Sequence, residues 1–227
     1  MDMGPFAAWR WQRLFNDSNI FILGLKNTLL ISFLALLLAL VIGFILGLAS
    51  TSSNKALKGV TRAYVEFFQN TPLAVQVFFF YNALPALGIK FSVRAIGVLG
   101  VGLYHGAYVS EVVRAGINSI PVGQLEAAKS QGFQTLQALV VVIIPQAIKI
   151  MLPPLTNQAV NLIKNTSVLS TIAGGELMYL TNKWVSSGTL NYGPGFVVAG
   201  VIYFLLCFPL AYLARKYEEN LKAKTTR

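Results

Sequence analysis

The stretch LLISFLALLLALVIGFILGL, residues 29–48, carries no charged side chain. An α-helix needs about 20 apolar residues to cross the ~30 Å hydrocarbon core of a bilayer, so this stretch predicts a membrane-spanning helix. The apolar region begins near Ile20 and is interrupted once, at Lys26. It is too long for the core of a signal peptide and no small-residue cleavage pattern follows it, so we expect a retained first span.

The composition of the whole chain agrees with a membrane protein. Of its 227 residues, 55% are hydrophobic and 11% are charged, whereas soluble proteins usually have about 25% charged residues. The net charge is +10. Basic residues that flank membrane spans explain this excess better than nucleic-acid binding, which would need a clustered polar domain, so we expect an all-α integral membrane protein with no nucleic-acid partner.

Four further apolar stretches follow, at residues 71–89, 95–110, 136–163 and 196–214. The glycines of the 95–110 stretch indicate close helix contact rather than exposure to lipid. Pro145, Pro153 and Pro154 predict that the fourth span is kinked or broken and lies inside the assembly, where its freed backbone groups find partners. We therefore predict one transmembrane domain over residues 1–227, with an interfacial N-terminal segment (1–19), a five-helix core (20–214) and a tail (215–227).

The distribution of positive charge predicts the orientation, because Lys and Arg prefer the cytoplasmic side. The tail carries Arg215, Lys216, Lys222, Lys224 and Arg227, and the segments after the first and third predicted spans carry Lys55, Lys58, Arg62, Arg114 and Lys129. The residues on the other side are Arg10, Arg13, Lys90 and Arg94, so the bias is modest. We predict a cytoplasmic C-terminus and an N-terminus outside, as an odd number of spans requires.

One long polar segment, EVVRAGINSIPVGQLEAAKSQGFQTLQ at residues 111–137, separates the third and fourth predicted spans. Pro121 suits a first helical position, with Ser119 upstream as a possible cap. Gly132 can adopt a left-handed conformation and end the helix, and a second helix then begins at Phe133. We expect a short helix, a glycine turn and a second helix on the cytoplasmic face, a rigid lever that a partner protein can hold.

Within this segment, EAAKSQGFQTLQALVVVIIP resembles a known motif: EAA, three residues, Gly, nine residues and Ile-x-Leu-Pro. That motif belongs to the membrane subunits of bacterial ABC importers. The matching residues are Glu126, Ala127, Ala128, Gly132 and Pro145, while Val142 and Ile144 replace the Ile and the Leu. Because a helix of Glu, Ala, Lys and Gln is ordinary surface material, it is the spacing of the glycine and the proline that makes the match specific.

Three other stretches, at residues 66–85, 108–128 and 161–177, resemble the polar amino-acid permease branch of this family, the histidine/glutamine/glutamate/arginine type. The resemblance covers about residues 25–221. One departure is Gln69, where the branch usually has Arg before the Asn/Gly-Thr-Pro step. It leaves open the role of that arginine in the relatives.

The resemblance implies a type I ABC importer transmembrane subunit with five transmembrane helices and a cytoplasmic coupling helix. It places Glu126, Ala127, Ala128 and Gly132 at the contact with an ATPase. The chain has no G-x-x-x-x-G-K-[ST] phosphate loop, so it is not expected to be an enzyme or to hold a cofactor. The implied partners are two ATPase subunits that bind ATP and magnesium, a second permease subunit that is identical or homologous, and an extracellular or periplasmic substrate-binding protein. The implied location is the bacterial cytoplasmic (inner) membrane.

The predicted substrate path follows polar residues at membrane depth. Asn157, Gln158, Asn161, Lys164 and Asn165 are three and four residues apart, so they share one helical face. Such residues face protein or a water-filled cavity, as an amino-acid site or as hydrogen bonds between helices. Gln76 is expected to join the path, and Lys164 can instead extend to the membrane interface.

No acidic residue lies within this stripe, and a guanidinium or ammonium side chain would favour one. This tilts the expected substrate toward Gln, Glu, Asn or Asp, and Lys164 would favour an acidic one. A partner subunit or the nearby Glu176 could instead supply a negative charge, which would favour a cationic substrate. His105, the single histidine, is expected to pack or to form hydrogen bonds, although a proton-coupled carrier could use it.

Three alternatives are weighed against an ATP-driven importer. A secondary carrier or channel without an ATPase would have inverted repeats and buried carboxylates, and neither is visible. An intramembrane enzyme would need a catalytic motif, and a single histidine and the single Cys207 cannot supply a metal site. A structural scaffold would not explain the long cytoplasmic segment.

Overall fold

The computed structural model describes residues 4–187 and 192–225, which are helical and contain no strand. The predicted all-α class is confirmed. The helices are α1 (Ala8–Asn16), α2 (Ser18–Thr51), α3 (Lys55–Asn70), α4 (Leu73–Ala86), α5 (Val93–Asn118), α6 (Val122–Ser130), α7 (Thr135–Ala138), a π-helical turn (Leu139–Ile143), α8 (Ile144–Asn165), a 3-10 segment (Thr166–Ile172), α9 (Leu177–Ser186) and α10 (Tyr192–Thr225).

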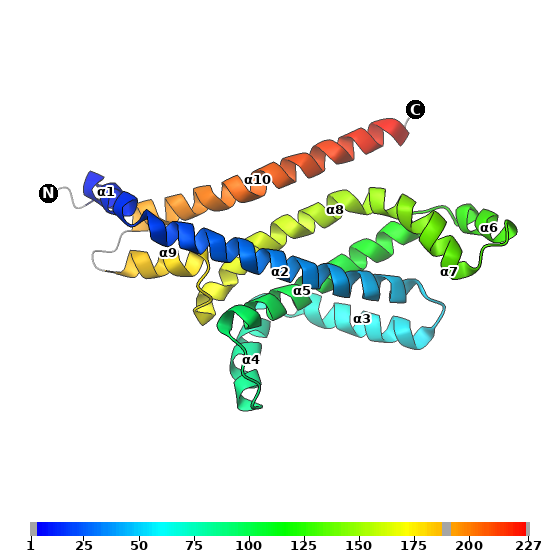
Figure 1. Ribbon diagram of the computed structural model, residues 1–227, viewed down its shortest axis with the longest axis horizontal. Helices are drawn as coiled ribbons and strands as arrows, with labels where there is room; N and C mark the ends of the chain where they lie inside the picture. Colours follow the sequence, from blue (N-terminus) through cyan, green and yellow to red (C-terminus); the bar gives the residue numbers. More distant parts are fainter. Residues whose placement is uncertain (1–3, 188–191, 226–227) are drawn as a thin grey trace.

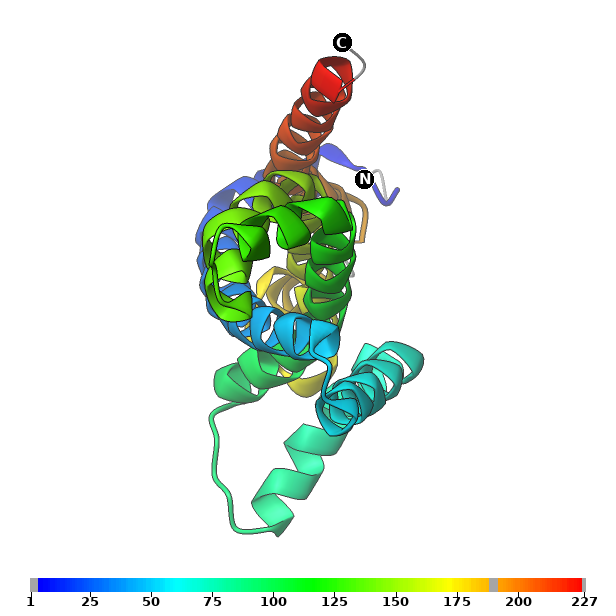
Figure 2. The same cartoon turned by 90° about the vertical axis from the view of Figure 1, so that its right-hand side faces the viewer.

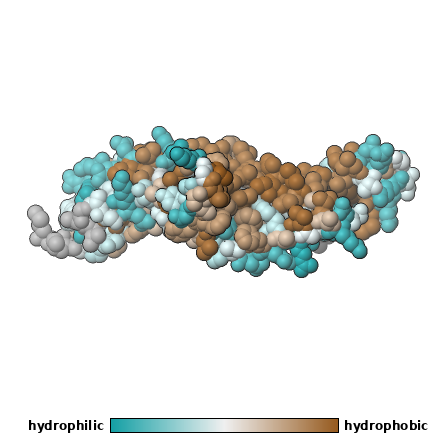
Figure 3. Space-filling view, turned by 90° about the horizontal axis from the view of Figure 1, so that it is seen from below, coloured by the Kyte–Doolittle hydropathy of each residue, from teal (hydrophilic) through white to brown (hydrophobic). Residues whose placement is uncertain are grey.

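The long helices α2, α5, α8 and α10 run roughly along the long axis of the molecule (Figure 1). The short helices α6 and α7, the turn between α2 and α3, and the C-terminus lie at one end, and the N-terminal α1 lies at the other. Figure 3 shows a broad hydrophobic surface between hydrophilic groups at the two ends. This distribution suits a protein whose middle lies in a bilayer.

Four helical segments in the described residues are long and apolar enough to cross a membrane: Ser18–Thr51, Val93–Asn118, Thr135–Ile172 and Tyr192–Leu221. The expected span at 71–89 differs, because α4 has only 14 residues. At 1.5 Å per residue it is about 21 Å long, less than the hydrocarbon thickness. Pro72 separates α4 from α3, and α4 projects away from the bundle (Figure 2). A fifth span therefore stays a prediction.

The most extensive helix contact in the described residues joins α2 and α5. Gly43 and Gly47 of α2 lie directly against Val109 and Val113 of α5, where an added Cβ would overlap the valine side chains. Among the four candidate spans, α5 is the most buried and α10 the least. Small residues let helix backbones approach closely in a membrane. The prediction that the glycine-rich third span is packed rather than exposed to lipid is confirmed.

The fourth span is irregular ahead of its first proline. The π-helical turn Leu139–Ile143 comes directly before Pro145, and the Gln146 side-chain amide donates to the Val142 carbonyl at 2.8 Å. Helix α8 then continues through Pro153 and Pro154. The predicted interruption is therefore present at Pro145, whose missing N–H is accommodated by a wider turn and a side-chain donor.

The N-terminal segment includes a helix, as predicted, and α1 contacts α9 through polar groups. Trp184 Nε1 donates to Asp17 at 2.8 Å, and Arg13 donates to the Ser187 carbonyl at 2.9 Å. The expected position of this segment at the membrane interface remains a prediction. Of the tail residues, Arg227 and the side chains of Lys222 and Lys224 lie outside the described part of the chain.

Replacing Gly43 with alanine tests the α2–α5 contact. The added methyl meets Val109, and overpacking of this kind costs about 1–3 kcal/mol. We expect Gly43→Ala to lower the apparent Tm of the purified protein by several degrees. The matched control is Gly59→Ala on α3, where nothing lies within 4 Å of the new Cβ, so that the Tm should stay equal or rise slightly. Equal Tm values for both variants would contradict the close contact.

Candidate functional site

The EAA-like segment forms a helix and a sharp turn at one end of the molecule (Figure 1). At the end of α6, Gly132 N–H donates to the Lys129 carbonyl and Phe133 N–H donates to the Ala128 carbonyl, at 2.9 Å and 3.2 Å. This pair of bonds is the Schellman motif, which requires a left-handed residue after the helix. Gly132 has φ +89°, so the predicted left-handed glycine is confirmed.

The four residues predicted to contact an ATPase do not all face outward. Glu126 and Ala127 are exposed and a Cβ added to Gly132 would meet nothing within 4 Å, whereas Ala128 is 5% exposed. Ala128 therefore packs against other residues of this chain and not toward a partner. Gln146 of α8 also donates to the side chain of Gln124 at 3.4 Å, which ties α6 to the next span.

The start of this segment differs from the sequence prediction. The polar stretch expected from residue 111 is helical up to Asn118, as part of α5. The Ser119 hydroxyl donates back to the Gly116 carbonyl, so it does not cap α6, and Pro121 precedes the first helical residue. The second helix begins at Thr135 rather than Phe133, with Gln134 and Gln137 forming a capping box.

A polar pocket of about 380 Å³ lies between α5 and α8. Its seven described lining residues are Tyr104, His105, Tyr108, Gln158, Asn161, Lys164 and Asn165. Four of the six residues predicted for the substrate path therefore lie together. Of these four, Asn161 and Lys164 are exposed and Gln158 and Asn165 are half-buried, so the pocket is open on one side of the chain.

The other two predicted path residues lie elsewhere. Asn157 is exposed on α8 and does not line this pocket. Gln76 is buried near the break between α3 and α4, where its amide donates to the carbonyls of Phe68 and Thr71, each at 3.0 Å. These hydrogen bonds connect the start of α4 to the end of α3.

The aromatic wall of the pocket was missed by the sequence prediction. Tyr104 and Tyr108 are four residues apart on α5, and their hydroxyls are 3.1 Å apart. Their ring centroids lie 5.3 Å and 6.1 Å from that of His105. The i, i+4 spacing around the single histidine was the available signal.

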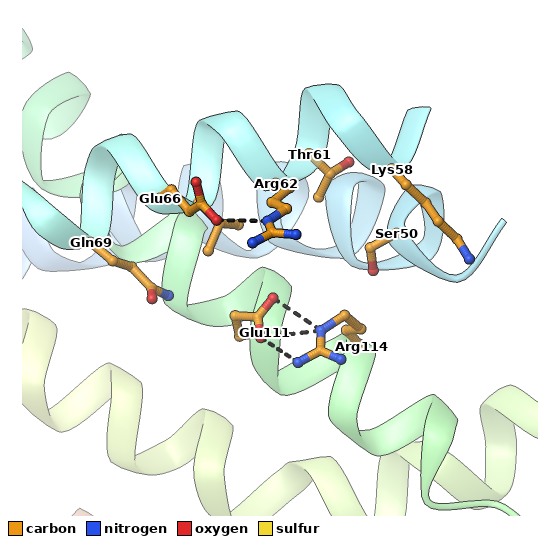
Figure 4. A pocket seen from close by; sticks show the side chains of 9 residues that line it. Ser50, Lys58, Thr61, Arg62, Glu66, Gln69, Glu111 and Arg114 are labelled. Atoms are coloured by element: carbon orange, nitrogen blue, oxygen red, sulfur yellow. Dashed lines mark hydrogen bonds and ion pairs between the residues drawn. The ribbon is translucent and has the colours of Figure 1, made fainter. Parts of the chain in front are cut away.

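A second pocket, of about 430 Å³, lies between α3 and α5 and contains paired charges (Figure 4). Arg62 donates to Glu66 at 2.6 Å, and Arg114 donates to Glu111 at 2.6 Å. The partners of each pair are four and three residues apart on one helix, so both are local ion pairs. The unusual Gln69 lines the same pocket and donates to the Ala107 carbonyl at 3.4 Å.

Glu176 is fully buried at the start of α9 and does not line the polar pocket. Its carboxylate accepts hydrogen bonds from the N–H groups of Met178 and Tyr179, at 2.6 Å and 2.8 Å, and from the Tyr203 hydroxyl at 3.3 Å. Burial raises the pKa of Glu176 to about 7, although these three donors act to lower it. The structure thus assigns Glu176 to the α9 cap, not to the stripe that includes Asn165.

Taken together, the apolar spans, the polar pocket between α5 and α8 and the exposed helix α6 are typical of a membrane-embedded transport subunit. Residues 39–222 match the family model described as "Binding-protein-dependent transport system inner membrane component". The chain belongs to this family, the permease subunits of ABC importers.

Relatives with similar sequences are permeases of the same kind of transporter. The chain is 38% identical over 211 residues to the probable glutamine ABC transporter permease protein GlnM of Bacillus subtilis, covering 91% of this chain and 97% of the relative. It is 39% identical over 209 residues to the putative glutamine transport system permease protein GlnP of Rickettsia bellii, covering 91% and 95%.

Solved structures support the same fold. The chain matches a permease chain in the crystal structure of an amino acid ABC transporter with histidines, with a TM-score of 0.83, 33% identity and coverage of 92% and 97%. It also shares the fold of one chain in a structure of the MetNI methionine ABC transporter in an inward-facing conformation, with a TM-score of 0.72, 16% identity and coverage of 89% and 98%. The resemblance to a type I ABC importer permease, with no enzymatic activity of its own, is confirmed.

The buried carboxyl of Glu176 predicts a pH-dependent stability. Its pKa is about 7 in the folded chain against an ordinary 4.5, so between these values the folded state holds a proton that the unfolded state releases. Stability should therefore fall as the pH rises through this window and level off above it. Glu176→Gln keeps an oxygen for the α9 N–H groups but cannot ionise. The apparent Tm of this variant should depend less on pH than that of the unsubstituted protein between about pH 5 and about pH 8. An unchanged pH profile would show that ionisation of Glu176 does not cause the pH dependence.

Proposed function

We propose that this chain is the permease subunit of an ATP-driven importer of polar amino acids, with Gln, Glu, Asn and Asp favoured, and that it forms half of the translocation pathway. The observation that carries the proposal is the pocket between α5 and α8. It combines three side-chain amides with the Lys164 ammonium, and none of its seven described lining residues is acidic.

The chemistry of this pocket fits a zwitterionic amino acid. Lys164 offers a positive charge for a carboxylate, and the amides of Gln158, Asn161 and Asn165 can donate to or accept from a carboxylate, an ammonium group or a side-chain amide. A cationic side chain would meet Lys164 without a compensating carboxylate from this lining. The names of the two glutamine permease relatives are consistent with this preference.

The connection between α5 and α8 supports a mechanical role for α6. The segment that includes α6 and α7 joins the C-terminal end of α5 to the start of the span that contains α8, and these are the two walls of the pocket. An ATPase that binds ATP and magnesium would contact the exposed Glu126 and Ala127. Movement of α6 is then transmitted to both walls, because a link of three residues, 119–121, joins α6 to α5, and the Gly132 turn and the Gln124–Gln146 contact hold it to the span that contains α8.

The open side of the pocket supports a second permease subunit, identical or homologous. Asn161 and Lys164 are exposed, so one chain does not enclose a path for a solute. The complex would contain two permease subunits, two ATPase subunits and an extracellular or periplasmic substrate-binding protein. We propose no cofactor in this chain itself.

The orientation that we propose places the N-terminus outside and the C-terminus in the cytoplasm. The basic residues Lys55, Lys58, Arg62, Lys129, Arg215 and Lys216 lie on segments near the α6 end (Figure 1). Positive charge favours the cytoplasmic side, and an ATPase can reach α6 only there. The location is the bacterial cytoplasmic membrane.

A substrate screen on the reconstituted complex tests the proposed function. ATP turnover is measured with the substrate-binding protein loaded with each amino acid in turn, together with uptake into vesicles. Gln, Glu, Asn or Asp should stimulate turnover several-fold more than Arg, Lys or His. Maximal stimulation by a cationic amino acid would contradict the proposed substrate class, and uptake without an ATPase would contradict the importer.

Substitution of Gly132 tests the coupling segment. A β-branched side chain is strongly disfavoured at φ +89°, so Gly132→Val should disturb the turn that orients α6. We expect at least about a tenfold loss of amino acid transported per ATP hydrolysed, because a misoriented lever no longer moves the pocket walls.

Two variants act as controls for this experiment. Gly132→Asn tolerates the left-handed conformation and should retain most coupling. Gly123→Ala lies on α6 with no neighbour within 4 Å and should leave coupling unchanged. Normal transport by Gly132→Val would contradict the role of this turn.

A further inference from the structure

The single histidine of the chain lies against one of the pocket amides. His105 is 2% exposed, and its Nε2 lies 3.1 Å from Asn165 Nδ2. The other ring nitrogen, Nδ1, is buried and has no hydrogen-bond partner among the described residues. Tyr104 packs edge-on against the imidazole, with an interplanar angle of 79°, and so restricts rotation of the ring.

With Asn165 Nδ2 facing Nε2, the tautomer of the imidazole follows. An amide NH₂ group can only donate, so Nε2 of the neutral imidazole must accept and the ring proton must be on Nδ1. The Asn165 amide is then held with its oxygen away from the histidine. That oxygen accepts no hydrogen bond from the described residues, and it is not one of the buried polar atoms that lack a partner. Because Asn165 lines the pocket, the oxygen is available to a ligand there.

We propose that His105 is a positioning residue, which holds the Asn165 amide so that its oxygen accepts a hydrogen bond from the α-ammonium group of the transported amino acid. This inference rests on the proposed function of the pocket. It divides the zwitterion between two neighbours on α8, with the carboxylate on Lys164 and the ammonium on Asn165. A freely rotating amide would present NH₂ to the ammonium for part of the time and would bind it less well.

The arrangement predicts a preference for substrates with a free α-ammonium group. Replacing that group by hydrogen leaves the Asn165 oxygen without its donor, and the loss of one hydrogen bond to a charged group reduces affinity by about tenfold or more. The discrimination between an amino acid and its deamino analogue should therefore depend on both His105 and Asn165.

The first experiment reads the tautomer directly. Because the chain has one histidine, ¹⁵N-histidine labelling of the assembled complex gives one imidazole signal from this chain, which is identified by its absence in His105→Gln. The expected spectrum has a protonated Nδ1 and an unprotonated Nε2 that accepts a hydrogen bond. A protonated Nε2 would place the Asn165 oxygen toward His105 and would overturn the proposal.

The second experiment measures binding of radiolabelled glutamine to the complex in nanodiscs without the binding protein, with glutamine and its deamino analogue as competitors. The intact complex should favour glutamine by about tenfold or more. His105→Leu and Asn165→Leu should each reduce this ratio toward one. His105→Gln, whose side-chain oxygen can accept from Asn165 Nδ2, should keep most of it, and Asn157→Leu, on the same helix outside the pocket, should keep all of it.

The outcomes separate the two proposals. If glutamine and the other favoured amino acids bind but the intact complex does not distinguish glutamine from the deamino analogue, the positioning role is wrong and the proposed function stands. If His105→Leu keeps the discrimination, the histidine has only a structural role and the proposal is wrong. If none of the favoured amino acids binds while a cationic one does, both the proposed substrate class and this inference fail.

Discussion

The contact between α2 and α5 is the constraint on which the rest of the structure depends. Association of helices in a bilayer gains little from the hydrophobic effect, so it relies on close packing. Gly43 and Gly47 allow α5 to approach α2 directly, and α5 is thereby held inside the bundle. Because one face of α5 contacts α2, another is free to contact α8 across a polar pocket.

The same helix connects the pocket to the α6 end of the molecule (Figure 1). Helix α5 carries His105 in its middle and continues to Asn118, only a few residues before α6. A well-packed helix transmits displacement along its axis better than a loop does, since its backbone hydrogen bonds keep it rigid. The added length of α5 that the sequence prediction assigned to a loop therefore shortens the connection between α6 and the pocket.

The spans and the EAA-like turn could be predicted because their signals are local. A run of about 20 apolar residues and a glycine at a fixed distance from a helix each define their own conformation. The short length of α4 was harder to predict, because the uncharged stretch at 71–89 continues past the end of this helix at Ala86. The burial of Ala128 depends on the path of the chain after Gly132, so the motif alone could not separate residues that face a partner from residues that face the chain itself.

The polar residues of α8 also show that a local sequence pattern does not reveal which side chains other helices cover. Helical spacing placed Asn157 and Gln158 next to each other, but only Gln158 lines the pocket, since the direction of α5 decides which edge of the stripe is covered. Glu176 lies near the stripe in sequence, yet its carboxylate is occupied by the N–H groups of α9. The pocket consequently has a cation and amides without a described carboxylate. A polar site of this composition favours a ligand that brings its own negative charge, and a zwitterion does so without adding net charge to the membrane interior.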